Sequence, residues 1–294
     1  CFLKVYDEHN PEVYGLGEAA LFPGLSPEAN EEYELKLIEL LANIALGRPT
    51  DLSRHSSIQY GLEMALRDFA GGGKRLYWPS EFTEGKESLT INGLVWMGSY
   101  EEMLDRMEEK IRQGFRCIKL KIGAIDFDAE TALLKRIRER FSPREMQIRL
   151  DANCAFPYDQ ALYKLELLSQ YAIHSIEQPI KTRRWGDMAE LCRDSPLPIA
   201  LDEELIGVND TETKAQMLNI IKPAYIVLKP SLHGGMRGTE EWIRLAGERG
   251  IGSWITSALE SNVGLNAVAQ LTAKMYGDRI TMPQGLGTGR LYTD

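Results

Sequence analysis

Several features are scarce in this 294-residue chain, and each scarcity narrows what the protein can be. Its four cysteines are scattered and form no CxxC pair, which argues against a disulfide framework and favours a reduced, cytoplasmic protein. No Lys/Arg-rich run occurs in a chain of formal net charge −9, so the sequence gives little reason to expect binding to nucleic acid or to an anionic membrane. The longest apolar runs fall far short of the ~20 residues that cross a bilayer.

The N-terminal part of the chain mixes strand-like and helix-like segments. We expect a strand over residues 1–7, a loop over 18–28, and helices over 28–47 and 56–70. The glycine run Gly71–Gly73 closes the second helix and could serve as a hinge. These elements predict a small α+β domain over residues 1–87, whose true start we expect to lie upstream of Cys1.

From residue 88 the chain alternates strands and helices, which predicts βαβ units and a parallel sheet. Eight strands with seven intervening helices in residues 88–294 favour an α/β fold, a modified TIM barrel of (β/α)7β type followed by the start of a tail. An open doubly wound sheet is the alternative, but no GxGxxG motif follows the first strand. The expected strands are 90–97, 116–122, 146–152, 173–178, 198–203, 225–230, 252–258 and 280–284, with helices such as 99–113, 128–141, 157–171, 236–249 and 262–276.

One charged residue ends each of five consecutive predicted strands. These residues are Lys121, Asp151, Glu177, Asp202 and Lys229, separated by steps of 30, 26, 25 and 27 residues. The steps are close to the ~31 residues of one unit in a typical ~250-residue barrel of eight units. Because the strands of such a barrel all run the same way, we expect the five side chains to meet at its carboxyl-terminal face, where barrel enzymes carry their active sites.

Three carboxylates brought together repel one another unless a cation joins them. An all-oxygen set without His or Cys suits a hard ion, and Mg²⁺ leaves its other coordination positions to water or substrate. We therefore expect Asp151, Glu177 and Asp202 to bind Mg²⁺. The four histidines lack metal-ligand spacing and are expected to be structural or on the surface: His9, His55, His174 and His233.

The strand over residues 116–122 contains two lysines. Since side chains alternate along a strand, Lys119 and Lys121 point to the same side of a largely apolar segment, where they are costly to desolvate and repel each other. An amine acts as a base only when it is deprotonated, and a neighbouring ammonium or divalent cation lowers its pKa. We therefore predict that Lys121 is the catalytic base and that Lys119, one pleat deeper, tunes it. Lys229 would flank the substrate from the opposite side.

Together these motifs resemble the muconate-lactonizing-enzyme-like subgroup of the enolase superfamily. KxK on the second barrel strand, then DAN, EQP, DEE and LKP on strands three to six, form that pattern, and the N-terminal segment resembles the subgroup's capping domain. The resemblance covers nearly the whole chain. It implies that Asp151, Glu177 and Asp202 are Mg²⁺ ligands and that Lys121 and Lys229 are the paired acid/base positions. The subgroup's first capping strand and mobile specificity loop, and part of its tail, are expected to be missing from this sequence.

Members of this superfamily abstract the proton α to a carboxylate, while Mg²⁺ stabilises the resulting enediolate. Within the subgroup, the segments TSALESNVGL and RLDAN resemble members that dehydrate their substrate by β-elimination, which implies a carbon–oxygen lyase. By this resemblance Lys121 would remove the α-proton and later protonate the departing hydroxide. Lys229 would stay cationic and stabilise the anionic intermediate, through a cation–π contact as its ring becomes aromatic.

Four further residues are expected to contact a small carboxylate substrate. Arg149 and Asn153 share the inward face with Asp151 by strand alternation and could orient base and substrate. Ser261 and Asn262 stand at the start of a predicted helix, where free N–H groups favour an anion, so they could hold a substrate carboxylate. Simple N-capping by these two residues is the equal alternative.

Other functions stay open at this point, including that of a dipeptide epimerase or of another racemase or cycloisomerase of the superfamily. An epimerising member of the subgroup usually carries a DxD motif after the last strand, but that region reads GLGTGRLYTD here. A Schiff-base lyase could use Lys229, which would leave the three carboxylates unexplained. A non-catalytic barrel would bind the metal without turnover. The oligomeric state is likewise open.

Overall fold

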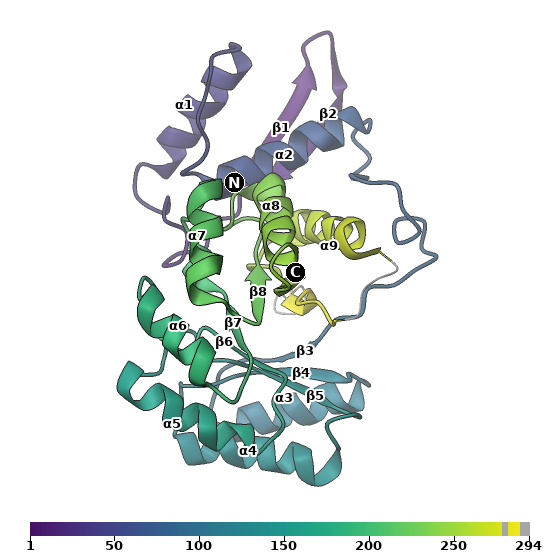
Figure 1. The fold of residues 1–294 in the computed structure, drawn as a ribbon. Coiled ribbons are helices and arrows are strands. Elements are labelled where there is room, and N and C mark those ends of the chain that lie inside the picture. The colour runs from purple at the N-terminus through teal and green to yellow at the C-terminus, as the bar shows by residue number, and fades with distance from the viewer. Residues whose placement is uncertain (278–281, 289–294) are drawn as a thin grey trace.

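The computed structural model describes residues 1–277 and 282–288, which form a barrel and an N-terminal cap (Figure 1). The cap consists of the antiparallel strands β1 (Phe2–Asp7) and β2 (Asn10–Glu18) and the helices α1 (Tyr33–Ala45) and α2 (Ser56–Ala70). The barrel strands are β3 (Gly93–Val95), β4 (Cys117–Lys121), β5 (Gln147–Asp151), β6 (Ser175–Glu177), β7 (Ile199–Leu201), β8 (Tyr225–Leu228) and β9 (Gly252–Ile255). Their connecting helices are α3 (Tyr100–Arg112), α4 (Phe127–Arg140), α5 (Tyr158–Ser169), α6 (Trp185–Asp194), α7 (Thr211–Ile221), α8 (Gly235–Gly247) and α9 (Asn262–Tyr276).

The barrel strands lie side by side in the order in which they occur in the sequence, all parallel, so each βα unit follows the last around the ring. Each of the barrel strands β3 to β9 lies inside the range predicted for it. The strands are apolar on the side facing the helices because that side packs in the main core, with residues such as Ile118, Leu150 and Ile176 fully buried. This arrangement confirms the predicted α/β barrel.

The ring closes through residues 284–285, at the place of the predicted eighth strand. Gln284 pairs in parallel with Ile91, ahead of β3, and Gly285 pairs with Thr256, just after β9. Backbone N–H groups donate on both sides, from Asn92 to the Gln284 carbonyl at 3.0 Å and from Gly285 to the Ile255 carbonyl at 2.8 Å. The contacts are isolated bridges, and residues 280–281 of the predicted strand lie outside the described part of the chain.

The cap contains a strand that the sequence did not predict. β2 pairs with β1 from Glu18 back to Asn10, and α2 packs across β2. This packing is close because Gly15 and Gly17 carry no side chain: a Cβ on them would lie 1.9 Å from the Ala65 carbonyl oxygen and 1.8 Å from that of Gly61. The glycines that make β2 look unlike a strand are therefore what lets helix and strand meet.

The cap rests on the barrel through α2, which lies beside α8 (Figure 1). Glu63 of α2 accepts hydrogen bonds from the Met236 N–H at 2.6 Å and from the Arg237 N–H at 3.3 Å, and so caps the N-terminus of α8. Among the described residues, the helices are too short or too polar to cross a membrane.

Candidate active site

The charged residues predicted to meet do meet at the carboxyl-terminal ends of the barrel strands. Lys121 is directly opposite Asp151, and Asp151 is directly opposite Glu177, in the registers of β4 with β5 and of β5 with β6. Asp202 lies two residues beyond Ala200, the partner of Glu177, and therefore points to the same side. The sequence spacing thus placed these side chains correctly.

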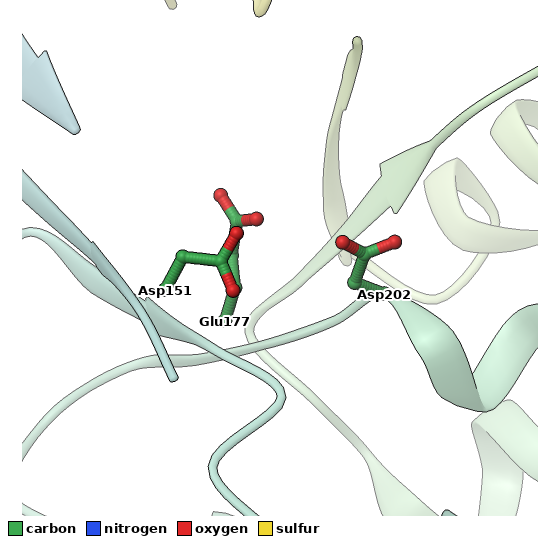
Figure 2. A group of neighbouring side chains, drawn as sticks. All are labelled: Asp151, Glu177 and Asp202. Atoms are coloured by element: carbon green, nitrogen blue, oxygen red, sulfur yellow. The ribbon is translucent and has the colours of Figure 1, made fainter. Parts of the chain in front are cut away.

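The three carboxylates form a compact group suited to a metal ion. Asp151, Glu177 and Asp202 each offer an oxygen within 4.8 Å of the others, and all three are fully buried. Figure 2 shows their carboxylates converging on one space, from Asp151 and Glu177 on one side and Asp202 on the other. Oε1 of Glu177 is buried without a hydrogen-bond partner among the described residues, so it is free to ligate a cation. The residues fit a hard divalent ion such as Mg²⁺.

The lysines surround this group and neutralise it. The Lys121 ammonium donates to Asp151 Oδ2 at 2.6 Å, and Lys229 donates to both oxygens of Asp202 at 2.7 and 2.6 Å. Lys119 lies 2.9 Å from Asp151 Oδ2 and also hydrogen-bonds Glu177. Lys121 and Lys229 thus approach the carboxylate group from opposite flanks, as the sequence predicted.

The electrostatics of these groups follow from burial and mutual charge. Burial raises the pKa of Glu177 to about 8, with Asp151 and Asp202 adding to the rise and Lys119 opposing it. Burial would also raise the pKa of Asp151, but Lys119 and Lys121 hold it well below its usual value. Burial lowers the pKa of Lys119, yet the surrounding carboxylates outweigh it and raise that pKa above the ordinary value. Without a metal, Lys119 is therefore a cation held by the carboxylates, and its tuning of Lys121 stays a prediction.

Two residues next to these carboxylates, Gln178 and Glu203, brace the site, and the sequence did not single either out. Gln178, buried with φ +36°, accepts at Oε1 from the backbone N–H groups of Asp202 and Glu204, both at 3.2 Å. This holds the turn after β7 against the end of β6. Glu203 accepts at 2.8 Å from the Asn153 amide. The available signal was that each directly follows a predicted metal-binding residue, in the pairs EQ and DE. The sequence around them does not show which way their side chains point.

A cavity of about 420 Å³ opens over the charged group. Its polar floor includes Lys121, Lys229 and Asn153, and the Lys121 ammonium also lies 5.5 Å from the ring centroid of Trp96. The other lining residues are Phe22, Pro23, Gly24, Leu25, Asn92, Leu94, Met97, Lys119, Asp151, Cys154, Glu203, Thr256, Ser257, Ala258, Leu259, Gly285, Gly287 and Thr288. The cavity therefore pairs a charged end with a largely apolar wall, as is typical of sites for small organic molecules.

Part of the apolar wall comes from the cap, from a segment read only as a loop in the sequence. We call residues 18–28 the strap. Its Phe22–Leu25 stretch lines the cavity, and its two ends are fixed by carboxylates at helix N-termini. Glu28 accepts from the Ser57 N–H of α2 at 2.8 Å, and Glu18 binds the start of α9. The strap is thus fixed to the cap at its Glu28 end and to the barrel at its Glu18 end.

Glu18 corrects the expectation for Ser261 and Asn262. The Glu18 carboxylate accepts from the Ser261 N–H at 2.9 Å, from its hydroxyl at 2.6 Å and from the Gly264 N–H at 2.8 Å. The anion at this helix end is therefore the protein's own, and Ser261 Oγ also caps Val263. Neither Ser261 nor Asn262 lines the cavity. The N-capping alternative holds for Ser261.

Arg149 is also misplaced by the sequence prediction. It points inward as expected, but it is fully buried below the cavity and does not line it. Its Nη1 donates to the Pro283 carbonyl at 2.8 Å, and its guanidinium lies 4.2 Å from the ring centroid of Trp254. Strand alternation fixed the correct side but not the depth. Asn153, by contrast, accepts from the Lys121 ammonium at 2.7 Å and does line the cavity.

None of the four histidines belongs to the group of three carboxylates found among the described residues. His233 is buried, and its Nδ1 accepts from the Lys229 backbone N–H at 2.9 Å. Burial, together with Lys229 and Lys214, lowers the pKa of His233 well below its usual range, so it supports the strand end as a neutral ring. The segment searched for a DxD motif extends into residues 289–294, outside the described residues.

Comparison with known proteins agrees with this geometry. The family model described as Enolase C-terminal domain-like matches residues 102–283. The chain is 46% identical to the o-succinylbenzoate synthase of Desulfotalea psychrophila, over 95% of this chain and 84% of that protein. It superposes on the crystal structure of MenC from the same organism with a TM-score of 0.84 and 44% identity, over 100% of this chain and 89% of that one.

A more distant relative is the L-Ala-D/L-amino acid epimerase of Maribacter sp., at 26% identity over 73% of this chain and 60% of that protein. Identity of 46% over nearly the whole chain, with the charged strand ends and the barrel in place, settles the family. The chain belongs to the enolase superfamily, with an Enolase C-terminal domain-like barrel.

Proposed function

We propose that this protein is an o-succinylbenzoate synthase, a hydro-lyase that converts 2-succinyl-6-hydroxy-2,4-cyclohexadiene-1-carboxylate to o-succinylbenzoate and water. The observation that carries the proposal is the 46% identity to a synthase over 95% of the chain. The paired lysines supply the required chemistry, because this β-elimination needs a base beside the acidic carbon and a positive charge near the anion that forms. The proposal places the protein in menaquinone biosynthesis, in the cytoplasm.

In the proposed reaction Lys121 removes the proton α to the carboxylate. The same ammonium then protonates the departing hydroxide, so the proton leaves as part of water and the ring becomes aromatic. Lys229, on the opposite flank, stays charged through its contact with Asp202 and stabilises the intermediate from the other ring face. The apolar wall formed by the strap and Trp96 excludes water from the ring.

Mg²⁺ held by Asp151, Glu177 and Asp202 would supply positive charge to the substrate carboxylate as the proton leaves. Its binding would also relieve the repulsion among these buried carboxylates. Lys119 and Lys121 contact Asp151 and would then have to share it with the ion.

The test is a direct assay of the purified full-length protein with the cyclohexadiene acid, followed by ultraviolet absorbance as the aromatic product forms. We expect Mg²⁺-dependent dehydration. Epimerisation of a dipeptide with deuterium uptake from D₂O, and no dehydration, would overturn the synthase and leave an epimerase. Borohydride trapping of a substrate adduct on Lys229 would instead favour a Schiff-base lyase.

A further inference from the structure

Glu203 is a charged residue of the cavity with no role in the chemistry described so far. It follows the ligand Asp202 in the short 3-10 helix η1 (Glu203–Leu205) and lines the cavity wall. Its Oε1 accepts from Asn153 Nδ2 at 2.8 Å. Its Oε2 is buried without a hydrogen-bond partner among the described residues. A carboxylate kept in this setting needs a reason, because its burial is costly.

Asn153 links Glu203 to the base. Its Oδ1 accepts from the Lys121 ammonium at 2.7 Å, while its Nδ2 donates to Glu203. Its backbone N–H donates to Asp151 Oδ1 at 3.1 Å, and its φ of +42° is unusual for a residue other than glycine. Both ends of the amide are therefore used, one for a cation and the other for an anion.

The two charges determine which way the amide points. Rotating it by half a turn would present NH₂ to the Lys121 ammonium and the amide oxygen to the Glu203 carboxylate, so both contacts would become repulsive. Without Glu203 only one of these contacts would oppose the rotation. Glu203 thus fixes the amide orientation that gives Lys121 an acceptor.

This tether matters because the other acceptor of Lys121 is shared. Asp151 Oδ2 also lies 2.9 Å from Lys119 and belongs to the carboxylate group suited to a metal. The second acceptor of Lys121, Asn153 Oδ1, does not belong to the group of three carboxylates. The backbone next to Glu203 is fixed as well, since Gln178 holds the N–H groups of its neighbours Asp202 and Glu204.

We propose that Glu203 is a positioning residue for Lys121, acting through Asn153. Among the described residues its hydrogen bond is to the Asn153 amide and not to the Lys121 ammonium; it orients the amide that holds the ammonium. The expected effect on the reaction rate rests on the proposed function, whereas the hydrogen bonds that join Glu203, Asn153 and Lys121 do not.

The test is a double-mutant cycle between the two residues. Glu203→Leu removes the acceptor, and its kcat should fall by about 10–100-fold with KM changed less than about threefold, because misplacing a catalytic group by ~1 Å can cost ~10²-fold. Asn153→Ala should have a similar effect, and the double variant should be no slower than the slower single variant. Glu203→Gln keeps an acceptor and should restore kcat to within about threefold of the parent.

Glu204→Gln is the matched control. This neighbouring carboxylate binds the Arg183 N–H at 2.7 Å and Trp185 Nε1 at 3.1 Å, and does not contact Asn153. Its effect should multiply with that of Asn153→Ala. Should Glu203→Leu fail to fold, Glu203→Ala replaces it in the same cycle.

Two results would overturn the proposal: multiplicative effects of Glu203→Leu and Asn153→Ala, or a loss of Mg²⁺ affinity by calorimetry that accounts for the whole kinetic defect. The same cycle measured on the urea unfolding midpoint tests the contact without any reaction. A parent protein inactive toward the cyclohexadiene acid, but with non-additive unfolding midpoints, would refute the proposed function and leave the hydrogen bonds that join Glu203, Asn153 and Lys121 intact.

Discussion

The barrel interior holds charged side chains at two depths, and their surroundings differ. At the upper layer, lysines and carboxylates alternate around the cavity, and each ammonium contacts at least one carboxylate. One pleat below, Arg149 faces the ring of Trp254, and deeper still His174, just before β6, stacks on Tyr225 at 5.0 Å between ring centroids. Nε and Nη2 of Arg149 have no hydrogen-bond partner within residues 1–277 and 282–288. In the upper layer a ligand could replace some of the ion pairs between lysines and carboxylates. In the lower layer the side chains are packed aromatic rings around one guanidinium.

Lys119 joins the two layers. Its Cα is opposite that of Arg149 in the lower row, yet its ammonium reaches up to Asp151 and Glu177. A long flexible side chain allows a residue rooted in the lower layer to contribute charge to the cavity. The comparison predicts that changes in the upper layer alter catalysis and metal binding, whereas changes in the lower layer alter stability.

The largest effect is expected from removing the base. Lys121→Ala should abolish dehydration, because the other lysine on that side, Lys119, starts one pleat deeper and its ammonium is held by Asp151 and Glu177. Lys119→Ala should retain trace turnover, since it deletes a neighbouring charge and not the proton carrier. Steady-state rates of both variants, with circular dichroism as the folding control, check this. Near-normal turnover of the Lys121 variant would mean that the base is misassigned.

Chelation should have an effect nearly as large on activity, and a visible one on stability. Activity should vanish in excess chelator and return with Mg²⁺. Because the ion binds only the folded carboxylate group, Mg²⁺ should also raise the melting temperature, by an amount that grows with its concentration. Asp151→Asn should weaken this stabilisation. A protein fully active in excess chelator would refute the metal site.

Lys229 should show an intermediate loss that depends on charge. Lys229→Arg keeps a cation but cannot act as a base, because guanidinium does not deprotonate. If Lys229 only stabilises the anion, the Arg variant should exceed Lys229→Ala in kcat/KM by about tenfold, which is less than the ~10²–10⁴-fold that a general acid–base group contributes. Equal rates for the two variants would indicate that Lys229 transfers a proton, as in an epimerase.

The smallest effect is expected from the lower layer, and it depends on pH. Burial, with Arg149 adding to it, lowers the pKa of His174 to about 4 from an ordinary 6.5. Between those values the unfolded chain binds a proton that the folded one does not, so stability should fall as the pH drops from 6.5 towards 4. His174→Phe should flatten this dependence. Urea unfolding midpoints at pH 7.5 and 5 measure the difference, and a parallel fall in both proteins would exclude His174 as its source.

Much of the upper layer could be predicted because the positions of its residues follow from short stretches of sequence. A strand fixes the side to which each residue points, and the regular βα repeat brings Asp151 and Glu177 to the same height. The depth of a side chain in the barrel, and hydrogen bonds to residues far away in the sequence, could not be predicted in this way. Arg149 obeyed the alternation but lay one pleat too deep, and Ser261 was bound by Glu18, 243 residues away in the sequence. β2 was missed because Gly15 and Gly17 are unusual in strands, although here they allow the strand to pack closely against α2.

Barrel closure through Gln284 has a consequence for how the protein is made. On the ribosome the seven strands from β3 to β9 emerge before the residues that bridge Ile91 and Thr256. Until then the sheet has two free edges, and unpaired strand edges are sites of wrong association between chains. A sheet of these seven strands alone would therefore expose two unpaired edges, which residues 284–285 pair in the folded protein.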